Sequence, residues 1–257
     1  MSSKKQSLTQ QIAAVPAVVL AAGKGTRMQA AEPKAAVRVG GKPMAARVAE
    51  AMRGAGITRI IAVLGHRAED VRAAIGAGVE YVVQDAQLGT GHAARCAQVA
   101  LKGYGGPVVI AYADIPLLTK EDVSRLLTRH LLSAPAVTML TAVPAQPGTL
   151  GRILRGPDEN VTGIVEARDA SEEQLGINEI NVGVYCFEAP EIFEILIGLR
   201  NENAQGQYYL TDAIGILVER GKRVEAVPLQ EAHNGMGVDT LEDLKRAQQL
   251  SGSSRAR

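Results

Sequence analysis

The feature of this sequence that most constrains its fold is the alternation of short apolar runs with amphipathic segments through its first half. The runs are rich in Val, Ile and Ala without intervening polar residues, which is typical of strands covered on both faces of a parallel sheet. The segments between them carry apolar residues at helical spacing, and one begins with the capping signal Thr119-x-x-Asp122. The pattern predicts strands at 17–22, 59–64, 79–84 and 107–112, and helices at 42–54, 68–75, 90–101 and 119–132.

The second half has more apolar runs, and Pro and Gly residues punctuate it. Strands are expected at 136–143, 151–155, 161–167, 180–187 and 223–227, and helices at 209–220 and 240–250. We predict one α/β domain over 12–250: a Rossmann-like, mixed and mostly parallel sheet with helices on both faces, and a strand-rich lobe. Its halves are 12–135 and 136–239, 240–250 is a closing helix, and 1–11 and 251–257 are expected to be flexible tails.

Composition argues against several classes of function. The chain has 28 Lys and Arg against 27 Asp and Glu, a net charge of +1 that differs from the basic excess of a general nucleic-acid binder. Aromatic residues make up 3% of the chain, so platforms for base stacking are not expected. Cys96 and Cys186 have neither metal-site nor disulfide-framework spacing, which suits a reducing cytoplasm. No feature of the sequence indicates a protein partner.

The apolar run at 12–22 follows Lys4 and Lys5, so it can be interpreted as a secretory signal or as a buried first strand. Pro16 interrupts the run, and a polar glycine-rich loop follows it instead of a cleavage site, so we favour the strand. No run reaches the ~20 continuous apolar residues of a membrane span. A cytoplasmic protein without membrane contact is therefore expected.

A glycine-rich turn follows the first expected strand. Gly23 and Gly25 allow the backbone to approach a ligand closely, and successive N–H groups of such a turn can hold phosphate oxygens. Arg27 and Lys34 add two cations suited to phosphate. The spacing is not that of a P-loop, and the third glycine of the dinucleotide fingerprint would fall at Met28. The alternative is an ordinary tight turn with solvated charges, which the combined glycines and cations disfavour.

Two carboxylates, Asp114 and Asp239, lie at the ends of expected secondary-structure elements. Asp114 follows a buried strand, where an unpaired carboxylate is costly unless it binds a cation. Asp239 directly precedes a helix. Mg²⁺ prefers one or two carboxylates together with substrate phosphates, so the pair is a candidate metal site. The alternative is that each carboxylate only caps the next turn or helix.

Further polar residues are candidates for ligand recognition. Gln84 and the turn Gly89-Thr90 end a strand and open a helix, where their polar groups suit the edge of a base; the alternative is a loop with an N-cap, and we interpret His92 as structural. Asp212 is expected to cap a helix. In the second half, four residues set among apolar ones could orient a polyhydroxylated ligand or simply tie strands together: Gly151, Glu166, Asn181 and Thr211.

Together these residues resemble the sugar-1-phosphate nucleotidyltransferases, most closely the uridylyltransferase (pyrophosphorylase) domain of bacterial N-acetylglucosamine-1-phosphate uridylyltransferase. The resemblance runs from about 18 to 250, with the motifs in family order. It rests on Leu-Ala-Ala-Gly-Lys-Gly-Thr-Arg-Met at 20–28, Pro-Lys at 33–34, Glu-Ile-Asn-x-Gly at 179–183, and Asn-Ala-Gln-Gly-Gln-Tyr-Tyr-Leu-Thr-Asp at 203–212.

The resemblance implies a role for each matching position. Arg27, Lys34 and Asp114 would be catalytic, and Asp114 and Asp239 would hold Mg²⁺. The first half of the domain would bind UTP and the second half the sugar 1-phosphate. Nucleotide contacts would come from Leu20, Ala21, Ala22, Gly23, Gly25, Thr26, Lys34, Gln84, Gly89 and Thr90, and sugar contacts from Tyr112, Gly151, Glu166, Asn181 and Thr211.

The implied reaction is transfer of a uridylyl group from UTP to N-acetylglucosamine-1-phosphate, giving UDP-N-acetylglucosamine, a cell-wall precursor, and pyrophosphate. The sequence departs from the family at Ala113, Leu150 and Asp239, where the family usually has Gly, Tyr and Asn. Bifunctional members continue into an acetyltransferase β-helix whose hexapeptide repeats are not found here, so neither that activity nor its trimer is expected.

Three alternatives stay open at this point. The first is another sugar phosphate or another nucleotide. The second is a molybdenum-cofactor guanylyltransferase, which typically has Asp-Lys where this chain has Pro33-Lys34. The third, from a different class, is a catalytically silent nucleotide-sugar binding module, which the four charged residues Arg27, Lys34, Asp114 and Asp239 disfavour.

Overall fold

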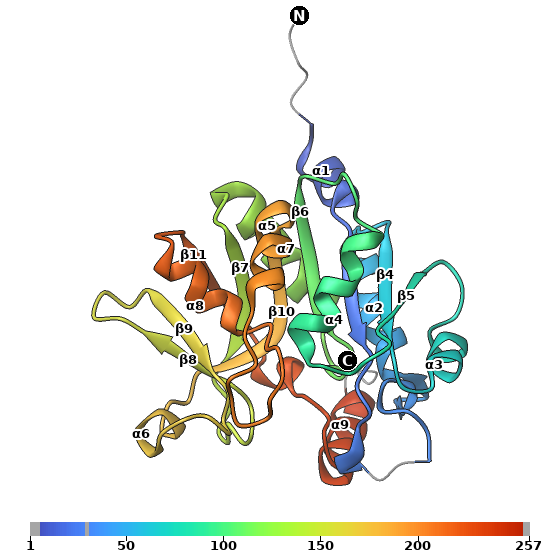
Figure 1. Cartoon of the computed structure of the whole chain (residues 1–257). Coiled ribbons are helices and arrows are strands. Elements are labelled where there is room, and N and C mark those ends of the chain that lie inside the picture. Colours follow the sequence, from blue (N-terminus) through green and yellow to red (C-terminus); the bar gives the residue numbers. More distant parts are fainter. Residues whose placement is uncertain (1–5, 29–30, 254–257) are drawn as a thin grey trace, which may run out of the picture.

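The computed structural model describes residues 6–28 and 31–253, and a nine-stranded mixed sheet runs through it (Figure 1). The central strand β1 lies between β4 and β6 and is parallel to both, which places the carboxyl ends of these strands at one edge of the sheet. The path across the sheet is β11 (Val224–Pro228), β7 (Val137–Ala142), β10 (Ile180–Glu188), β6 (Pro107–Tyr112), β1 (Ala17–Ala21), β4 (Ile60–Leu64) and β5 (Glu80–Val83).

The long strand β10 makes the sheet mixed. It runs antiparallel to β6 on one side and to β7 on the other, and its register shifts between Asn181 and Tyr185. It also pairs with β8 (Arg152–Arg155), which pairs in turn with β9 (Val161–Val165) to form the strand-rich lobe. Because β10 is antiparallel to β6, its first residues lie at the edge where β1, β4 and β6 end. The predicted mixed, mostly parallel sheet is confirmed.

Helices cover both faces of this sheet, and alternate residues of β1 explain why. Val19 packs in one apolar cluster with residues of α2 (Met44–Gly54), α3 (Ala68–Ile75) and α5 (Lys120–Ser133). Val18 packs in a second cluster with residues of α4 (Thr90–Cys96), α7 (Ala189–Gly198) and α8 (Asp212–Glu219). A strand buried on both faces needs apolar residues at every position, which is the pattern of the continuous runs.

A third, smaller cluster joins the end of the domain to its beginning. Helix α9 (Leu241–Ser253) packs Ala247 and Leu244 beside Met28 and Val39. The side-chain amide of Gln248 accepts from Gly40 N at 2.9 Å and donates to Arg38 O at 2.8 Å. These two hydrogen bonds hold the hairpin of β2 (Arg38–Val39) and β3 (Lys42–Pro43) against α9. Helix α9 therefore supports the segment that follows the glycine-rich turn.

Several expected boundaries are wrong. Residues expected in a tail form α1 (Leu8–Ala14), which begins with a capping box between Ser7 and Gln10 and buries Ile12 in the core. Helix α2 begins at Met44 because Lys42 and Pro43 pair as β3, and the helix from Thr90 changes at Ala97 into the 3₁₀ turn η3 (Ala97–Val99). Helix α9 runs on to Ser253, where a tail was expected, and α8 is shorter than expected.

Besides α1, two further helices were not expected, α6 (Glu172–Leu175) and α7, and Pro190 lies in the first turn of α7. The remaining tail residues, 1–5 and 254–257, lie outside the described residues. No helix in the described ranges combines the length and apolar character needed to cross a membrane.

Candidate active site

The glycine-rich turn leaves β1 and leads into two short 3₁₀ turns, η1 (Thr26–Met28) and η2 (Lys34–Ala36). Gly25 has a φ of +63°, and a Cβ at this position would collide with the Cβ of Lys34. A side chain is therefore excluded here by backbone conformation and by space. Leu20, Ala21 and Ala22 are buried, so their side chains belong to the core rather than to a ligand-contacting surface.

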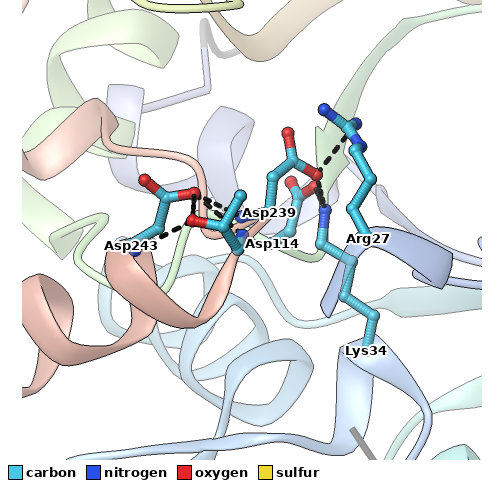
Figure 2. A network of polar contacts seen from close by, with 6 residues as sticks. Arg27, Lys34, Asp114, Asp239 and Asp243 are labelled. Carbon is cyan, nitrogen blue, oxygen red and sulfur yellow. Dashed lines mark hydrogen bonds and ion pairs between the residues drawn. The ribbon is translucent and has the colours of Figure 1, made fainter. Parts of the chain in front are cut away.

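An ion-pair network forms beside this turn (Figure 2). The ammonium of Lys34 donates to Asp114 Oδ2 and, at 2.5 Å, to Asp239 Oδ1. The guanidinium of Arg27 lies 3.1 Å from the same oxygen of Asp239. Val238 N donates to Asp114 O at 2.9 Å, which ties the backbones that carry the two carboxylates. Four residues from three segments of the chain thus meet at the edge where β1 and β6 end.

The charges in this network reinforce one another. Burial is the largest influence on the pKa of Lys34 and lowers it, but the charges and hydrogen bonds of Asp114 and Asp239 outweigh it and raise this pKa above its ordinary value. Burial raises the pKa of Asp239, yet Lys34 and Arg27 hold that pKa below its ordinary value. Lys34 and Asp239 are therefore both charged at neutral pH.

The chemistry of the two carboxylates suits a divalent metal ion. Asp114 and Asp239 converge on one cation, the Lys34 ammonium, so their oxygens already face a shared position. Their side chains keep 28% and 21% exposure, which leaves room for ligand oxygens. Mg²⁺ binds in proteins through one or two carboxylates plus substrate phosphates and waters. These residues therefore fit Mg²⁺.

Gln84 lies at the same edge of the sheet, just after β5, and its amide is held internally. Its Nε2 donates to Gly89 O at 3.1 Å and lies 2.8 Å from Nδ1 of His92. Burial, followed by the charge of Arg95, lowers the pKa of His92, so this ring is neutral and Nδ1 can accept. The sequence indicates only a structural role for His92, but its contact with Gln84 places it beside the candidate base-binding turn.

The turn at Gly89 is fixed by its neighbours. Gly89 has a φ of +116°, and a Cβ there would lie 2.5 Å from Tyr208 O. Thr90 Oγ1 accepts from Leu210 N at 3.0 Å, and Gly91 N donates to Tyr208 O at 2.8 Å. The candidate base-binding loop is therefore tied to the segment that leads into α8.

Buried hydroxyls connect this loop to the start of β10. The Tyr112 hydroxyl is in hydrogen-bonding contact with Thr90 and with Tyr185, and the Tyr185 hydroxyl donates to Asn181 Oδ1 at 2.9 Å. Gly183, with a φ of +81°, leaves the space that the Tyr112 ring occupies. Tyr112 and Asn181, expected at the sugar, thus lie in one chain of contacts, and Tyr185 is a member that the sequence did not indicate.

The other expected sugar residues gather around Glu166. Thr211 Oγ1 donates to Glu166 Oε1 at 2.9 Å, and a Cβ on Gly151 would lie 3.4 Å from Glu166 Oε2. Burial, followed by the charge of Asp169, raises the pKa of Glu166. Asp212 is not the helix cap that was expected, because α8 begins at Asp212 itself; burial, then Glu166 and Asp169, raise its pKa to about 6.

Residues 17–173 match the MobA-like NTP transferase domain family. The chain belongs to this family. The NTP transferase match covers the strands that carry the glycine-rich turn, Gln84, Asp114 and Glu166, and it confirms the predicted class of nucleotidyltransferase. The match ends before Asn181, Thr211 and Asp239. The structure brings Asn181 and Asp239 to the same edge of the sheet and Thr211 beside Glu166.

Curated relatives of this NTP transferase extend the likeness over nearly the whole chain. The chain is 46% identical over 236 residues to the bifunctional protein GlmU of Syntrophotalea carbinolica, and the aligned region covers 91% of this chain and 50% of the relative. It is 42% identical over 231 residues to the bifunctional protein GlmU of Acetivibrio thermocellus, covering 90% and 50%. The chain thus spans about half the length of the curated relatives that it matches.

A solved structure of UDP-glucose pyrophosphorylase complexed with UDP-glucose has the same fold as this NTP transferase. The TM-score is 0.75, with 20% sequence identity, over 93% of this chain and 99% of that one. At this identity the likeness concerns the fold. It confirms the predicted architecture, in which a mostly parallel sheet carries a strand-rich lobe.

Proposed function

We propose that this chain transfers a uridylyl group from UTP to N-acetylglucosamine-1-phosphate with Mg²⁺, releasing pyrophosphate. The observation that carries the proposal is the meeting of Arg27 and Lys34 with the carboxylates of Asp114 and Asp239 beside a glycine-rich turn. Cations for phosphates, carboxylates for a metal and a turn for close backbone approach are what nucleotidyl transfer requires. The relatives named GlmU support the choice of this reaction within the family.

The proposed chemistry needs no strong general base. The phosphate oxygen of the sugar 1-phosphate is already an anion at neutral pH, and it attacks the α-phosphorus of UTP in line as pyrophosphate leaves. Catalysis is then positioning plus neutralisation of charge. Arg27 and Lys34 stabilise the negative charge that develops on the phosphates. When bound by Asp114 and Asp239, Mg²⁺ supplies further positive charge to phosphate oxygens.

The choice of base and sugar rests on the groups around this centre. With both hydrogens of its amide directed to Gly89 and His92, Gln84 keeps its carbonyl oxygen to accept from a base such as uracil, which carries a ring N–H. On the sugar side, Glu166 is held by Thr211, and Asn181 lies at the end of the contacts from Tyr112. These groups suit the hydroxyls and amide of an N-acetylated sugar.

A second candidate is the same transfer to glucose-1-phosphate. It is favoured by the fold shared with a UDP-glucose pyrophosphorylase, and by Leu150 at a position where the family usually has Tyr. The reaction centre would be unchanged, and only the contacts of the sugar ring would differ. A catalytically silent binding module is the alternative from another class.

Pyrophosphate release from the purified chain tests the proposal. With UTP, N-acetylglucosamine-1-phosphate and Mg²⁺ we expect steady release, which EDTA abolishes and excess Mg²⁺ restores. Asp114→Asn keeps the shape of the side chain but loses its charge, so release by this variant should fall at least ~100-fold at fixed Mg²⁺. Nucleotide binding without release from either sugar phosphate would favour the silent module.

A further inference from the structure

The Lys34 ammonium lies where the two carboxylates of the candidate metal site converge. It donates to Asp114 Oδ2 and to Asp239 Oδ1 (Figure 2). The Lys34 side chain is only 13% exposed. Both carboxylates therefore already have a cation. A metal ion that uses the same oxygens competes with this ammonium for them.

The charges of the network make that competition strong. Two carboxylates, Asp114 and Asp239, face two cations, Lys34 and Arg27, so the four groups sum to zero. A divalent cation that enters while the ammonium stays meets a like charge a few ångströms away, in a part-buried site where Coulomb interactions are stronger than in water. Metal binding is therefore unfavourable until Lys34 moves.

The local structure lets the end of Lys34 move while its base stays in place. The stem packs against Gly25, and the backbone of η2 is held by Val37 N, which donates to Lys34 O at 3.2 Å. The ammonium at the end of four methylene groups can swing between partners. A nucleotide on the glycine-rich turn would present phosphate oxygens beside Gly25, the residue that touches this stem.

We propose that Lys34 is an exchangeable counter-cation of the metal site. Without ligand it neutralises Asp114 and Asp239 and keeps free divalent metal from binding tightly. When nucleotide phosphates bind, the Lys34 ammonium moves to contact their oxygens, which leaves both carboxylates free to bind the metal. Metal and nucleotide therefore bind with positive cooperativity, and Lys34 couples them. This role rests on the proposed function, because it requires that Asp114 and Asp239 hold the metal.

Binding of Mn²⁺ as a probe for Mg²⁺, followed by electron paramagnetic resonance of the free ion, tests the role without any turnover. Wild type, Lys34→Met and Lys34→Gln are titrated without nucleotide, and Lys42→Met is the matched control because Lys42 pairs with the exposed Glu50. We expect both Lys34 variants to bind Mn²⁺ about tenfold more tightly than wild type, although they lose turnover. Lys42→Met should match wild type.

Two further titrations distinguish the counter-cation role of Lys34 from the proposed function. Adding Asp114→Asn to Lys34→Met should remove the gain, because the metal then loses a carboxylate. Wild type titrated with UTP should bind Mn²⁺ more tightly than without it. If wild type binds Mn²⁺ with UTP but neither Lys34 variant binds it more tightly without nucleotide, the counter-cation role is wrong and the metal site stands. If wild type with UTP binds no Mn²⁺, both are wrong.

Lys34→Gln is included in case the apolar variant does not fold. Its amide is uncharged but still a hydrogen-bond donor, so it removes the charge while keeping a polar side chain at this position. Circular dichroism and the melting temperature establish that each variant is folded before titration. Equal or weaker Mn²⁺ binding by a folded Lys34→Gln overturns the proposal.

Discussion

Asp243 fixes the backbone of Asp239: its Oδ2 accepts from Asp239 N at 3.1 Å, and also from Thr240 N at 2.9 Å and Thr240 Oγ1 at 2.8 Å (Figure 2). Thr240 Oγ1 in turn accepts from Asp243 N at 3.1 Å. This cap therefore does more than begin α9. It also holds the backbone that carries the second carboxylate of the candidate metal site.

Asp243→Ala should therefore weaken metal binding as well as the helix. Loss of a helix cap costs about 1 kcal/mol of stability, and the freed backbone of Asp239 should raise the Mg²⁺ concentration needed for half-maximal activity. Asp243→Asn keeps an acceptor oxygen and should restore most of both. Glu242→Ala, one residue earlier on the exposed side of α9, is the control. A Mg²⁺ requirement equal to wild type in a folded Asp243→Ala would show that the cap does not position Asp239.

Arg27 should matter for turnover far more than for stability. Its side chain is 49% exposed and pairs with Asp239, and a half-exposed ion pair contributes at most ~1 kcal/mol. Removing a cation that stabilises charge developing on the phosphates costs at least ~100-fold in kcat. Arg27→Ala should therefore melt within a few degrees of wild type while losing its rate. A variant with near-normal kcat would refute the role given to Arg27.

Gly183 should tolerate no side chain. Its φ of +81° is strained for other residues, and a Cβ would enter the Tyr112 ring. Gly183→Ala should cost roughly 2–3 kcal/mol and raise the KM for sugar phosphate by displacing Tyr112. Gly215→Ala in α8 is the matched control, because nothing lies within 4 Å of its Cβ position and alanine favours helix. Denaturant titration compares the two; equal stabilities would contradict the account.

The contact of His92 with Gln84 predicts a limb in the pH profile for UTP binding. Burial holds the His92 pKa below its ordinary value of 6.5, so the ring is neutral above pH 6.5 and its Nδ1 accepts from Gln84. As the pH falls through the lowered pKa, protonation places two donors face to face. We expect the KM for UTP to rise about tenfold on the acid side, where a neutral hydrogen bond is lost.

His92→Asn should flatten this limb because the amide does not titrate, whereas His233→Asn, at a 38% exposed histidine, should leave it in place. The KM for UTP between pH 5 and 8 is the measurement, with a denaturation check at the acid end. An unchanged limb in His92→Asn would assign the titration to another group, such as a substrate phosphate.

Much of the fold follows from local pattern. The continuous apolar run that forms β6 and the periodic segment that forms α3 have the bounds that the sequence predicts, because β6 is buried along nearly its whole length and α3 buries one face, with Val71 and Ile75. Helix α7 was missed because its apolar residues follow β10 almost directly, and Ile and Phe suit strands as well as helices. Only Pro190, in the first turn, marked a helix start.

The short helix α1 was missed for a different reason. It has seven residues, too few for periodicity, and it is stabilised by a capping box and by burial of Ile12. The candidate site, too, could be predicted from the sequence only in part. That Asp114 and the glycine-rich turn share one edge follows from the parallel direction of β6 and β1. Asp239 lies before α9 rather than at the end of a strand, so strand direction does not place it. That Lys34 bridges the carboxylates, and that Asp243 holds Asp239, depends on side-chain packing that no spacing in the sequence reveals.

The central claim, uridylyl transfer to N-acetylglucosamine-1-phosphate, is tested most directly by competition in one reaction. The chain is supplied with equal UTP, dTTP, CTP and GTP, equal N-acetylglucosamine-1-phosphate and glucose-1-phosphate, and Mg²⁺, and the nucleotide sugars formed are measured by mass spectrometry. We predict that UDP-N-acetylglucosamine is the dominant product and that Arg27→Ala forms almost none. A different dominant nucleotide sugar would contradict the substrate assignment. If no nucleotide sugar formed at all, the proposal that this chain catalyses nucleotidyl transfer would be contradicted.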